Sequence, residues 1–227
     1  MLTLALDCSA RLCSVALYHG DTDRIVASAS PDIGRGHAEQ LPAIVEAVLA
    51  EAGMDLAQVR RIGVTIGPGS FAGIRVGVAF ARGLALALDA PCVGVGSLEA
   101  IAIPAALQSA KAVMAVLDAK RDRVWTLLVD ANGDVVDAGA ELTPAAAAGL
   151  AQTRGCGLIG SGAALLAGID ASLSSQVIAD IAAPKIEDVA RLAARLDPVG
   201  HPAEPRYLRD ADAKPQTGFA LAHEVAG

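Results

Sequence analysis

Residues 62–88, with the sequence IGVTIGPGSFAGIRVGVAFARGLALAL, constrain the fold of this chain more than any other stretch. A short β-branched run ends at Gly67-Pro68-Gly69, because proline has no backbone donor and glycine accepts a positive φ. A long helical pattern follows, and the hydroxyl of Ser70 is positioned to cap its first turn. The stretch therefore predicts a strand, a tight turn and a helix.

Small residues recur at every fourth position of this helix and form one nearly bare ridge: Gly73, Gly77, Ala81 and Ala85. A neighbouring face carries larger residues at the same spacing: Val76, Phe80, Leu84 and Leu88. A glycine inside a helix costs about 1 kcal/mol relative to alanine. The ridge therefore indicates close approach by another backbone, either within the fold or on a partner.

The composition suits a soluble acidic protein with a core of small side chains. Of 227 residues 53% are hydrophobic but only 3% aromatic, so alanine, valine and leucine must build the interior. The net charge of −7 makes the chain a poor lone binder of phosphate backbones or anionic membranes, and any role with nucleic acid is expected to be indirect. Four cysteines without CxxC spacing and a first strand without a signal-like leader indicate a reduced, cytoplasmic protein.

The order of predicted elements occurs twice along the chain. Strands are expected at residues 2–7, 13–19 and 24–30, then a helix up to Gly53, the central strand and helix, a strand at 92–95 and a helix at 97–107. A second cycle has strands at 112–118, 123–130, 135–142 and 157–160, with helices from Thr143, at 163–166 and at 186–196. We therefore expect a duplicated α/β fold with lobes at residues 1–108 and 109–227.

Two loops could contact a nucleotide. The loop from Gly67 to Gly73 offers helix N-terminal amides to an anion, but it has neither P-loop nor GxGxxG spacing, which favours a turn that lets the helix and strand pack tightly. Asp7 and Ser9, after the first strand, could hold a hydrated cation and phosphate or could bond their own turn. Weak ATP or ADP binding with Mg²⁺ remains open, with these candidate residues: Asp7, Ser9, Gly67, Gly69 and Ser70.

No metal or catalytic set is recognisable. His37-Ala38-Glu39 and Pro91-Cys92 imitate parts of a zinc deaminase signature, but the second cysteine of P-C-x-x-C is replaced by Val95. The densest charge cluster, residues 118–122 (DAKRD), could meet a partner or a nucleotide, or could be a solvated turn. We expect no catalytic residue and no metal ligand.

Six separate stretches resemble the bacterial TsaB family, also called YeaZ. They are LALDCSARLCSVAL, GHAEQL, GVTIGPGSFAGIRVGVAFARGLA, VGVGSLEAIA, LDAKRDRVW and PRYLRDADA, in order along nearly the whole chain. The departures are small: Ala72 stands where threonine is usual, Gly96 where serine is usual, and Lys120 and Trp125 where arginine and tyrosine are common.

The resemblance implies an α/β fold of two actin-like lobes (the ASKHA, ribonuclease H-like type), each a mixed sheet with flanking helices, the second lobe reduced. It also implies a non-catalytic scaffold that pairs with a TsaD-like paralogue, and that requires no cofactor of its own. The complex transfers threonylcarbamoyl to adenosine 37 of tRNAs that read A-starting codons. A TsaE-like ATPase and a second copy of the chain are further implied partners, with tRNA contacted indirectly and no membrane.

TsaD proteins hold their catalytic metal through the histidines of an H-x-E-G-H motif, and the matching segment here, Ser97 to Ala102, contains no histidine. The resemblance places the partner contact on the helices of the first lobe. The expected residues are Leu41, Ile44, Val45, Val48, Gly73, Val76, Gly77, Phe80 and Ala81. Periodicity alone leaves open which of them face the core. An actin-like small-molecule phosphotransferase and a metallopeptidase are the alternative functions.

Overall fold

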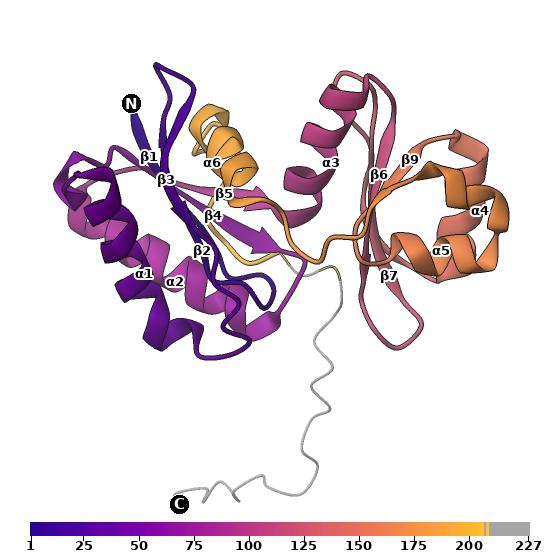
Figure 1. Ribbon diagram of the computed structural model, residues 1–227, viewed down its shortest axis with the longest axis horizontal. Helices are drawn as coiled ribbons and strands as arrows, with labels where there is room; N and C mark the ends of the chain where they lie inside the picture. Colours follow the sequence, from indigo (N-terminus) through magenta and orange to yellow (C-terminus); the bar gives the residue numbers. More distant parts are fainter. Residues whose placement is uncertain (207, 209–227) are drawn as a thin grey trace, which may run out of the picture.

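The computed structural model describes residues 1–206 and residue 208 (Figure 1). Tyr207 and residues 209–227 lie outside the described residues, and with them most of the PRYLRDADA stretch. The described chain forms two lobes, each built on a five-stranded sheet.

The first sheet has the order β3-β2-β1-β4-β5. Its strands are β1 (Leu2–Asp7), β2 (Ser14–His19), β3 (Arg24–Ala29), β4 (Arg61–Gly67) and β5 (Cys92–Gly96). β1, β2 and β3 form the expected antiparallel meander, whereas β4 and β5 join parallel to β1. Every residue of β1 is buried, because helices cover both faces of this sheet.

Helices α1 (His37–Ala52) and α2 (Phe71–Leu88) cover one face of the first sheet (Figure 1). The predicted cap is confirmed, since the Ser70 side chain accepts a hydrogen bond from the amide of Gly73. Gly53 ends α1 in the left-handed conformation, as expected for a helix C-terminus. A short 3₁₀ helix, η1 (Leu56–Gln58), leads into β4.

The second sheet repeats this order as β10-β9-β6-β7-β8. Its strands are β6 (Val113–Asp118), β7 (Val124–Val129), β8 (Val135–Leu142), β9 (Gly157–Ile159) and β10 (Val177–Ala179). Helices α4 (Pro144–Arg154) and α5 (Ala163–Ile169) pack together on one face, and η2 (Ala171–Gln176) precedes β10. The lobe keeps all five strands, and its reduction lies in β9 and β10, which are three residues each.

The last helix of each repeat packs against the sheet of the other repeat. Helix α3 (Ser97–Ser109) follows the first sheet but packs on β6 and β7, while α6 (Ile186–Arg195) returns to β1, β2 and β4 (Figure 1). A boundary at residue 108 therefore separates the two sheets but not the helices that cover them. The return of α6 depends on Gly63, where a Cβ atom would lie 2.2 Å from the Cβ of Ala193.

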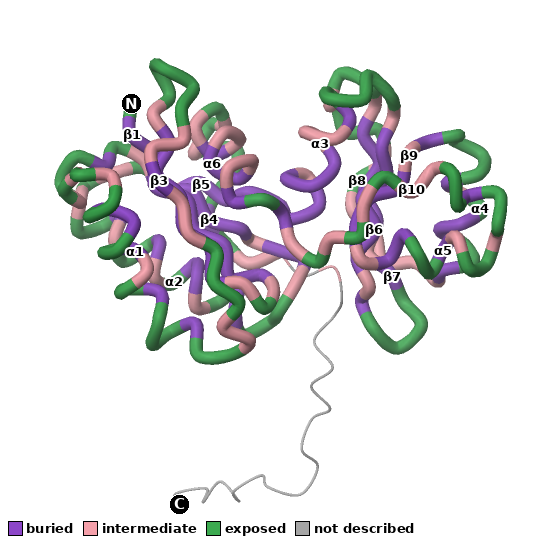
Figure 2. Tube along the Cα trace, viewed as in Figure 1, coloured by how far each residue is buried: buried purple, intermediate pink, exposed green. Residues whose placement is uncertain are grey.

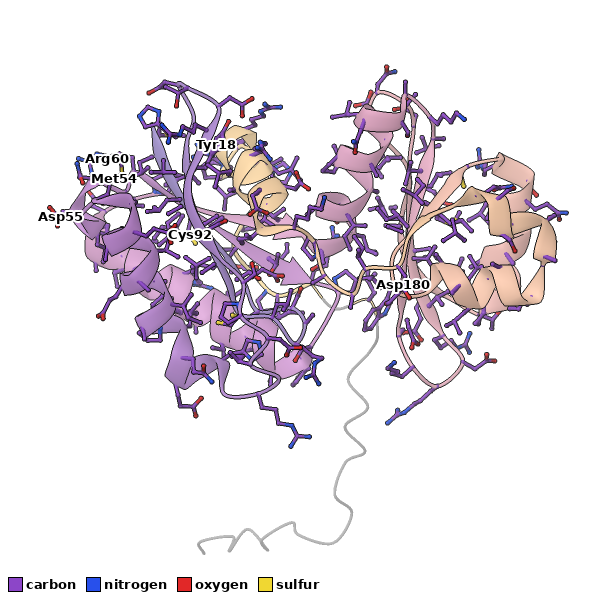
Figure 3. The ribbon with its side chains drawn as sticks, in the orientation of Figure 1. Tyr18, Met54, Asp55, Arg60, Cys92 and Asp180 are labelled. Atoms are coloured by element: carbon purple, nitrogen blue, oxygen red, sulfur yellow. The ribbon has the colours of Figure 1, made fainter. Side chains whose placement is uncertain are left out.

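The interior consists mainly of leucine, valine, isoleucine and alanine, as the composition indicates. Figure 2 shows the buried residues gathered along both sheets and along α3, which lies between the lobes. A connector, residues 180–185, starts at Asp180 and carries the chain from β10 in the second lobe back to α6 (Figure 3). The two lobes therefore meet along α3, α6 and this connector.

Candidate functional site

The glycine ridge of α2 faces the protein's own interior. A Cβ atom at Gly73 would lie 2.0 Å from the carbonyl oxygen of Cys8, so only glycine allows the helix to sit this close to the end of β1. Gly77 and Ala81, on the same side of α2, are also buried. The expectation that this ridge binds a partner is therefore wrong for these residues, because β1 and β4 already occupy it.

Three predicted contact residues of α1 are likewise core residues. Leu41, Val45 and Val48 are at most 3% exposed and pack in the hydrophobic core of the first lobe. Ile44, Val76 and Phe80 are only partly buried, and Ile44 and Phe80 pack at the margin of that core. Of the nine predicted contact residues, these three alone retain surface that a partner could touch.

A different set of residues is exposed on the same two helices, and Figure 2 shows exposed positions along both α1 and α2. We call this set the outer face; its members are Ala43, Ala47 and Ala50 on α1, and Ala72, Ala79, Gly83 and Leu86 on α2. Leu86 is 86% exposed and Phe71, at the start of α2, is 53% exposed. The Arg75 guanidinium stacks 3.8 Å from the centre of the Phe71 ring. The outer face is therefore apolar, narrow and accessible.

Helix α2 is long and apolar enough to cross a membrane by length and composition, with a mean hydropathy of 1.6 over 18 residues. Its inward side, however, packs on the sheet of a globular lobe, with Ile74, Val78 and Ala85 buried. Arg75 and Arg82 also interrupt its outward side. Exposed apolar residues on a helix that packs in a globular lobe are typical of a surface for protein interaction.

A cleft of about 870 Å³ lies between the lobes. Its walls come from the β1–β2 turn, the start of α2, the β6–β7 turn, the connector and the start of α6. Three of the predicted nucleotide-binding residues, Ser9, Gly69 and Ser70, line this cleft, and Asp7 and Gly67 lie outside its lining. A cleft of this size between two lobes can hold a small ligand.

Asp7 is fully buried at the end of β1. One carboxylate oxygen accepts hydrogen bonds from the Ser9 amide at 2.8 Å and from the Thr65 hydroxyl at 2.5 Å. The other oxygen has no hydrogen-bond partner in the described part of the chain. Burial raises the pKa of Asp7, although the hydrogen bonds from Thr65 and Ser9 act in the opposite direction. Asp7 thus shapes the turn that lines the cleft.

Two cleft residues, Trp125 and Lys185, are not among the site candidates from the sequence. Trp125, the only tryptophan, lines the cleft, and its indole nitrogen is buried without a hydrogen-bond partner in the described residues. Lys120 and Lys185 lie on the same lining. Lys120 belongs to the charged stretch at residues 118–122 that the sequence indicates as a possible nucleotide contact, whereas nothing local to Lys185 indicates that it lines the same cleft as Ser9.

The β6–β7 turn separates this cleft from a second, outer pocket of about 430 Å³. Asp118 and Lys120 line both cavities. Lys120, Arg121 and Asp122 all have left-handed backbone angles, with φ of 62°, 54° and 57°. Such a run is uncommon for residues with a Cβ atom, and it was not expected from the sequence.

The start of α3 contains Ser97 to Ala102, the segment that corresponds to the H-x-E-G-H metal-binding motif of TsaD proteins. Glu99 pairs there with Arg206, whose guanidinium lies 2.6 Å from the carboxylate. Within the described residues, no group of three or more His, Cys, Asp or Glu side chains is close enough to hold a metal ion. Glu99, the one acidic residue between Ser97 and Ala102, is therefore paired with an arginine of the chain itself.

Comparison with known proteins identifies the family. A family model described as TsaD, tRNA N6-adenosine threonylcarbamoyltransferase, matches residues 29–216. A Pseudomonas aeruginosa crystal structure, described as an uncharacterized protein similar to the peptidase YeaZ, has a TM-score of 0.74 at 32% identity, over 92% of this chain and 99% of that one. This chain belongs to the TsaB (YeaZ) family.

Curated relatives agree with this family. The tRNA threonylcarbamoyladenosine biosynthesis protein TsaB of Haemophilus influenzae is 39% identical over 124 residues, 54% of this chain and 51% of that protein. TsaB of Escherichia coli is 33% identical over 126 residues, 55% of this chain and 53% of that protein. The matched region thus spans about half the length of these TsaB proteins. The expected α/β fold of two lobes, each a mixed sheet with flanking helices, is confirmed.

Proposed function

We propose that this chain is the non-catalytic subunit that pairs with a TsaD-like paralogue in transferring threonylcarbamoyl to adenosine 37 of tRNAs that read A-starting codons. The names of its TsaB relatives support a role in threonylcarbamoyladenosine biosynthesis. Relatives named as the transferase also match, one from a Jannaschia species being 41% identical over 93 residues. The proposal includes a cytoplasmic location, for which the four free cysteines are suited.

The observation that carries the pairing is the outer face of α1 and α2. Its alanines and glycine let a second helix pair approach closely, and Leu86 supplies a large apolar side chain at 86% exposure. The two helices also differ in charge: α1 exposes Glu39 and Glu46, and α2 exposes Arg75 and Arg82. A partner that presents its own α2 to α1 would satisfy both sets of charges, which favours a paralogue or a second copy.

The sequence at the start of α3 supports a scaffold rather than a transferase. Ser97 and Ile101 take the places of the two metal-binding histidines of a TsaD protein. Their side chains offer no imidazole nitrogen to a metal ion. Glu99, between them, is paired with Arg206. In this proposal the TsaD-like partner performs the transfer, and a TsaE-like ATPase joins the assembly.

Reconstitution tests the proposal. Purified chain is added to a TsaD-like partner, a TsaE-like ATPase, threonylcarbamoyl-AMP and an unmodified tRNA transcript, and the modified nucleoside is measured by mass spectrometry. We expect transfer only when both this chain and the TsaD-like partner are present, and a one-to-one complex by light scattering. Full transfer without this chain, or transfer by this chain alone, would refute the scaffold role.

The interlobe cleft favours a second candidate function, weak adenine nucleotide binding. Ser9, Ser70 and Lys185 line it, and the N-terminus of α2 carries no acidic residue in its first turn. These groups suit a phosphate chain. Bound nucleotide could serve as a structural ligand or, in a phosphotransferase, as a substrate.

The single Trp125 makes this test direct, because it lines the cleft and is the only indole in the chain. Mg-ATP and Mg-ADP are titrated while tryptophan fluorescence is recorded, with the Ser9→Ala/Lys185→Ala variant as control. Saturable quenching that the variant weakens supports a nucleotide site. A flat titration up to millimolar nucleotide excludes one, and release of ADP with a small-molecule acceptor would establish the phosphotransferase instead.

A further inference from the structure

The β6–β7 turn keeps three consecutive side chains in a backbone conformation that favours glycine. Lys120, Arg121 and Asp122 all have positive φ, which brings each Cβ close to its own carbonyl. The turn is nevertheless well defined: the Lys120 amide donates to Asp118 at 2.8 Å, and the Ala119 amide donates to the Arg123 carbonyl at 3.0 Å. Backbone strain held in place by surrounding bonds is typical of a binding or catalytic site.

The turn also concentrates positive charge in an acidic lobe. Residues 97–184 contain five lysines and arginines, and three of them lie in this turn: Lys120, Arg121 and Arg123. Asp118 pairs with Lys120 at 2.5 Å, and Asp122 also lines the outer pocket, so the pocket carries one net positive charge. The Arg123 guanidinium has no hydrogen bond or ion pair with the residues that the structure describes.

The outer pocket also has an aliphatic part to its lining. Pro144, Leu165 and Ile169 form this part, and the side chains of Leu165 and Ile169 are 44% and 53% exposed. A pocket lined by both cations and aliphatic carbon suits a ligand with a phosphate and a flat apolar face. An unpaired nucleotide has both, and its base can also stack on an arginine plane. The volume of about 430 Å³ is large enough for one nucleotide.

We propose that the outer pocket binds one unpaired nucleotide of the RNA substrate, with Arg121 and Arg123 on its phosphates and Leu165 and Ile169 against its base. This inference rests on the proposed function, because the tRNA is delivered by the assembly rather than captured by this acidic chain alone. The contact is local and electrostatic. It therefore contributes a salt-dependent part of the affinity of the whole complex for tRNA.

The test measures binding of an unmodified transcript of a tRNA that reads A-starting codons to the complex of this chain with its TsaD-like partner, at several KCl concentrations. In the Arg121→Ala/Arg123→Ala variant we expect a three- to tenfold weaker affinity at low salt, on the order of two lost phosphate contacts. The slope of log affinity against log salt should become shallower by about 1.4, because each single-strand phosphate contact contributes about 0.7.

The matched control is Lys111→Ala/Arg154→Ala, which removes the same charge from exposed positions of the same lobe. We expect its affinity and salt slope to stay closer to the wild type. A second measurement maps the contact: RNA carrying 4-thiouridine is cross-linked, and the labelled peptide should contain residues 119–124 or 165–169.

Partner binding and transfer at saturating tRNA separate this inference from the proposed function. If the wild-type chain neither binds the TsaD-like partner nor restores transfer, the proposed function fails. If it does both, yet the arginine variant binds tRNA with wild-type affinity and slope, the pocket inference is overturned. It is also overturned if the variant keeps its tRNA affinity but no longer binds the TsaE-like ATPase, because the pocket then binds an acidic protein segment.

Discussion

Asp7 and Asp118 occupy the same position in the two repeats of the chain. Each ends the first strand of its sheet, and each accepts a hydrogen bond of 2.8 Å from the amide two residues later, in Ser9 and Lys120. The pKa values of the two carboxyl groups shift in opposite directions. Burial raises the pKa of Asp7; it also acts to raise that of Asp118, but the hydrogen bonds from Lys120 outweigh it and lower the pKa. The duplication thus places the same turn in two environments that shift the pKa of its aspartate in opposite directions.

Asp7 should make the free energy of unfolding fall as pH rises. In the unfolded chain it ionises near its ordinary pKa of 3.8, whereas in the fold burial keeps it protonated to higher pH. Between these two values the folded state binds more protons, so the free energy of unfolding decreases with increasing pH. We expect Asp7→Asn to reduce this decrease of the free energy of unfolding above pH 4. The variant should be at least as stable as the wild type at pH 7. Urea denaturation at several pH values measures both quantities. If the variant's free energy of unfolding depends on pH as that of the wild type does, the raised pKa of Asp7 is contradicted.

The two glycines of the buried ridge should differ in their tolerance of alanine. At Gly73 a methyl group would meet the Cys8 carbonyl at 2.0 Å, and backbone cannot move aside easily. We expect Gly73→Ala to destabilise the protein by about 2 kcal/mol or more. At Gly77 the nearest atoms are 3.5 Å away, an ordinary contact, so Gly77→Ala should gain up to about 1 kcal/mol from helix propensity. Thermal unfolding of the two variants is the measurement, and equal losses would contradict the described packing.

Ala79 lies in the middle of the outer face and is exposed on α2. Ala79→Arg should leave the free energy of unfolding within about 0.5 kcal/mol, because arginine is a good helix former at a surface site. The bulky side chain should nevertheless weaken binding of the TsaD-like partner at least tenfold, about 1.4 kcal/mol, by preventing close helix approach. Ala145→Arg, at an exposed position of α4, is the control. Calorimetry that finds equal affinities for both variants would move the partner contact elsewhere.

Arg206 should stabilise the first turn of α3 through Glu99. Removing it in Arg206→Ala leaves the partly buried carboxylate of Glu99 without its cation. Because the Arg206 side chain is 40% exposed, solvent screens the pair, and we expect a loss of about 1–2 kcal/mol rather than the full cost of a buried charge. Adding Glu99→Gln should recover most of that loss in a double-mutant cycle. Additive losses would mean that the two residues act independently.

Local chemistry in the sequence determined the elements and their order. The β-branched run, the Gly67-Pro68-Gly69 break and the Ser70 cap specify β4 and α2 within one stretch, because each depends on neighbouring residues alone. The repeated order of strands and helices likewise indicated two lobes of one type. The residues of the β1–β2 turn and of the charged β6–β7 turn could be recognised as candidates for a site in the same way.

Tertiary structure decided which surfaces are free. Periodicity defines the faces of α2 but not their direction, and here the inward stripe (Gly73, Gly77 and Ala81) and the outward stripe (Ala72, Ala79 and Gly83) are equally small. Only the packing of β1 against Gly73 distinguishes them. The exchange of α3 and α6 between the sheets, and the meeting of Ser9 with Lys185 in one cleft, depend on contacts between distant segments. Local sequence cannot specify such contacts, because their free energy is realised only when both lobes are folded together.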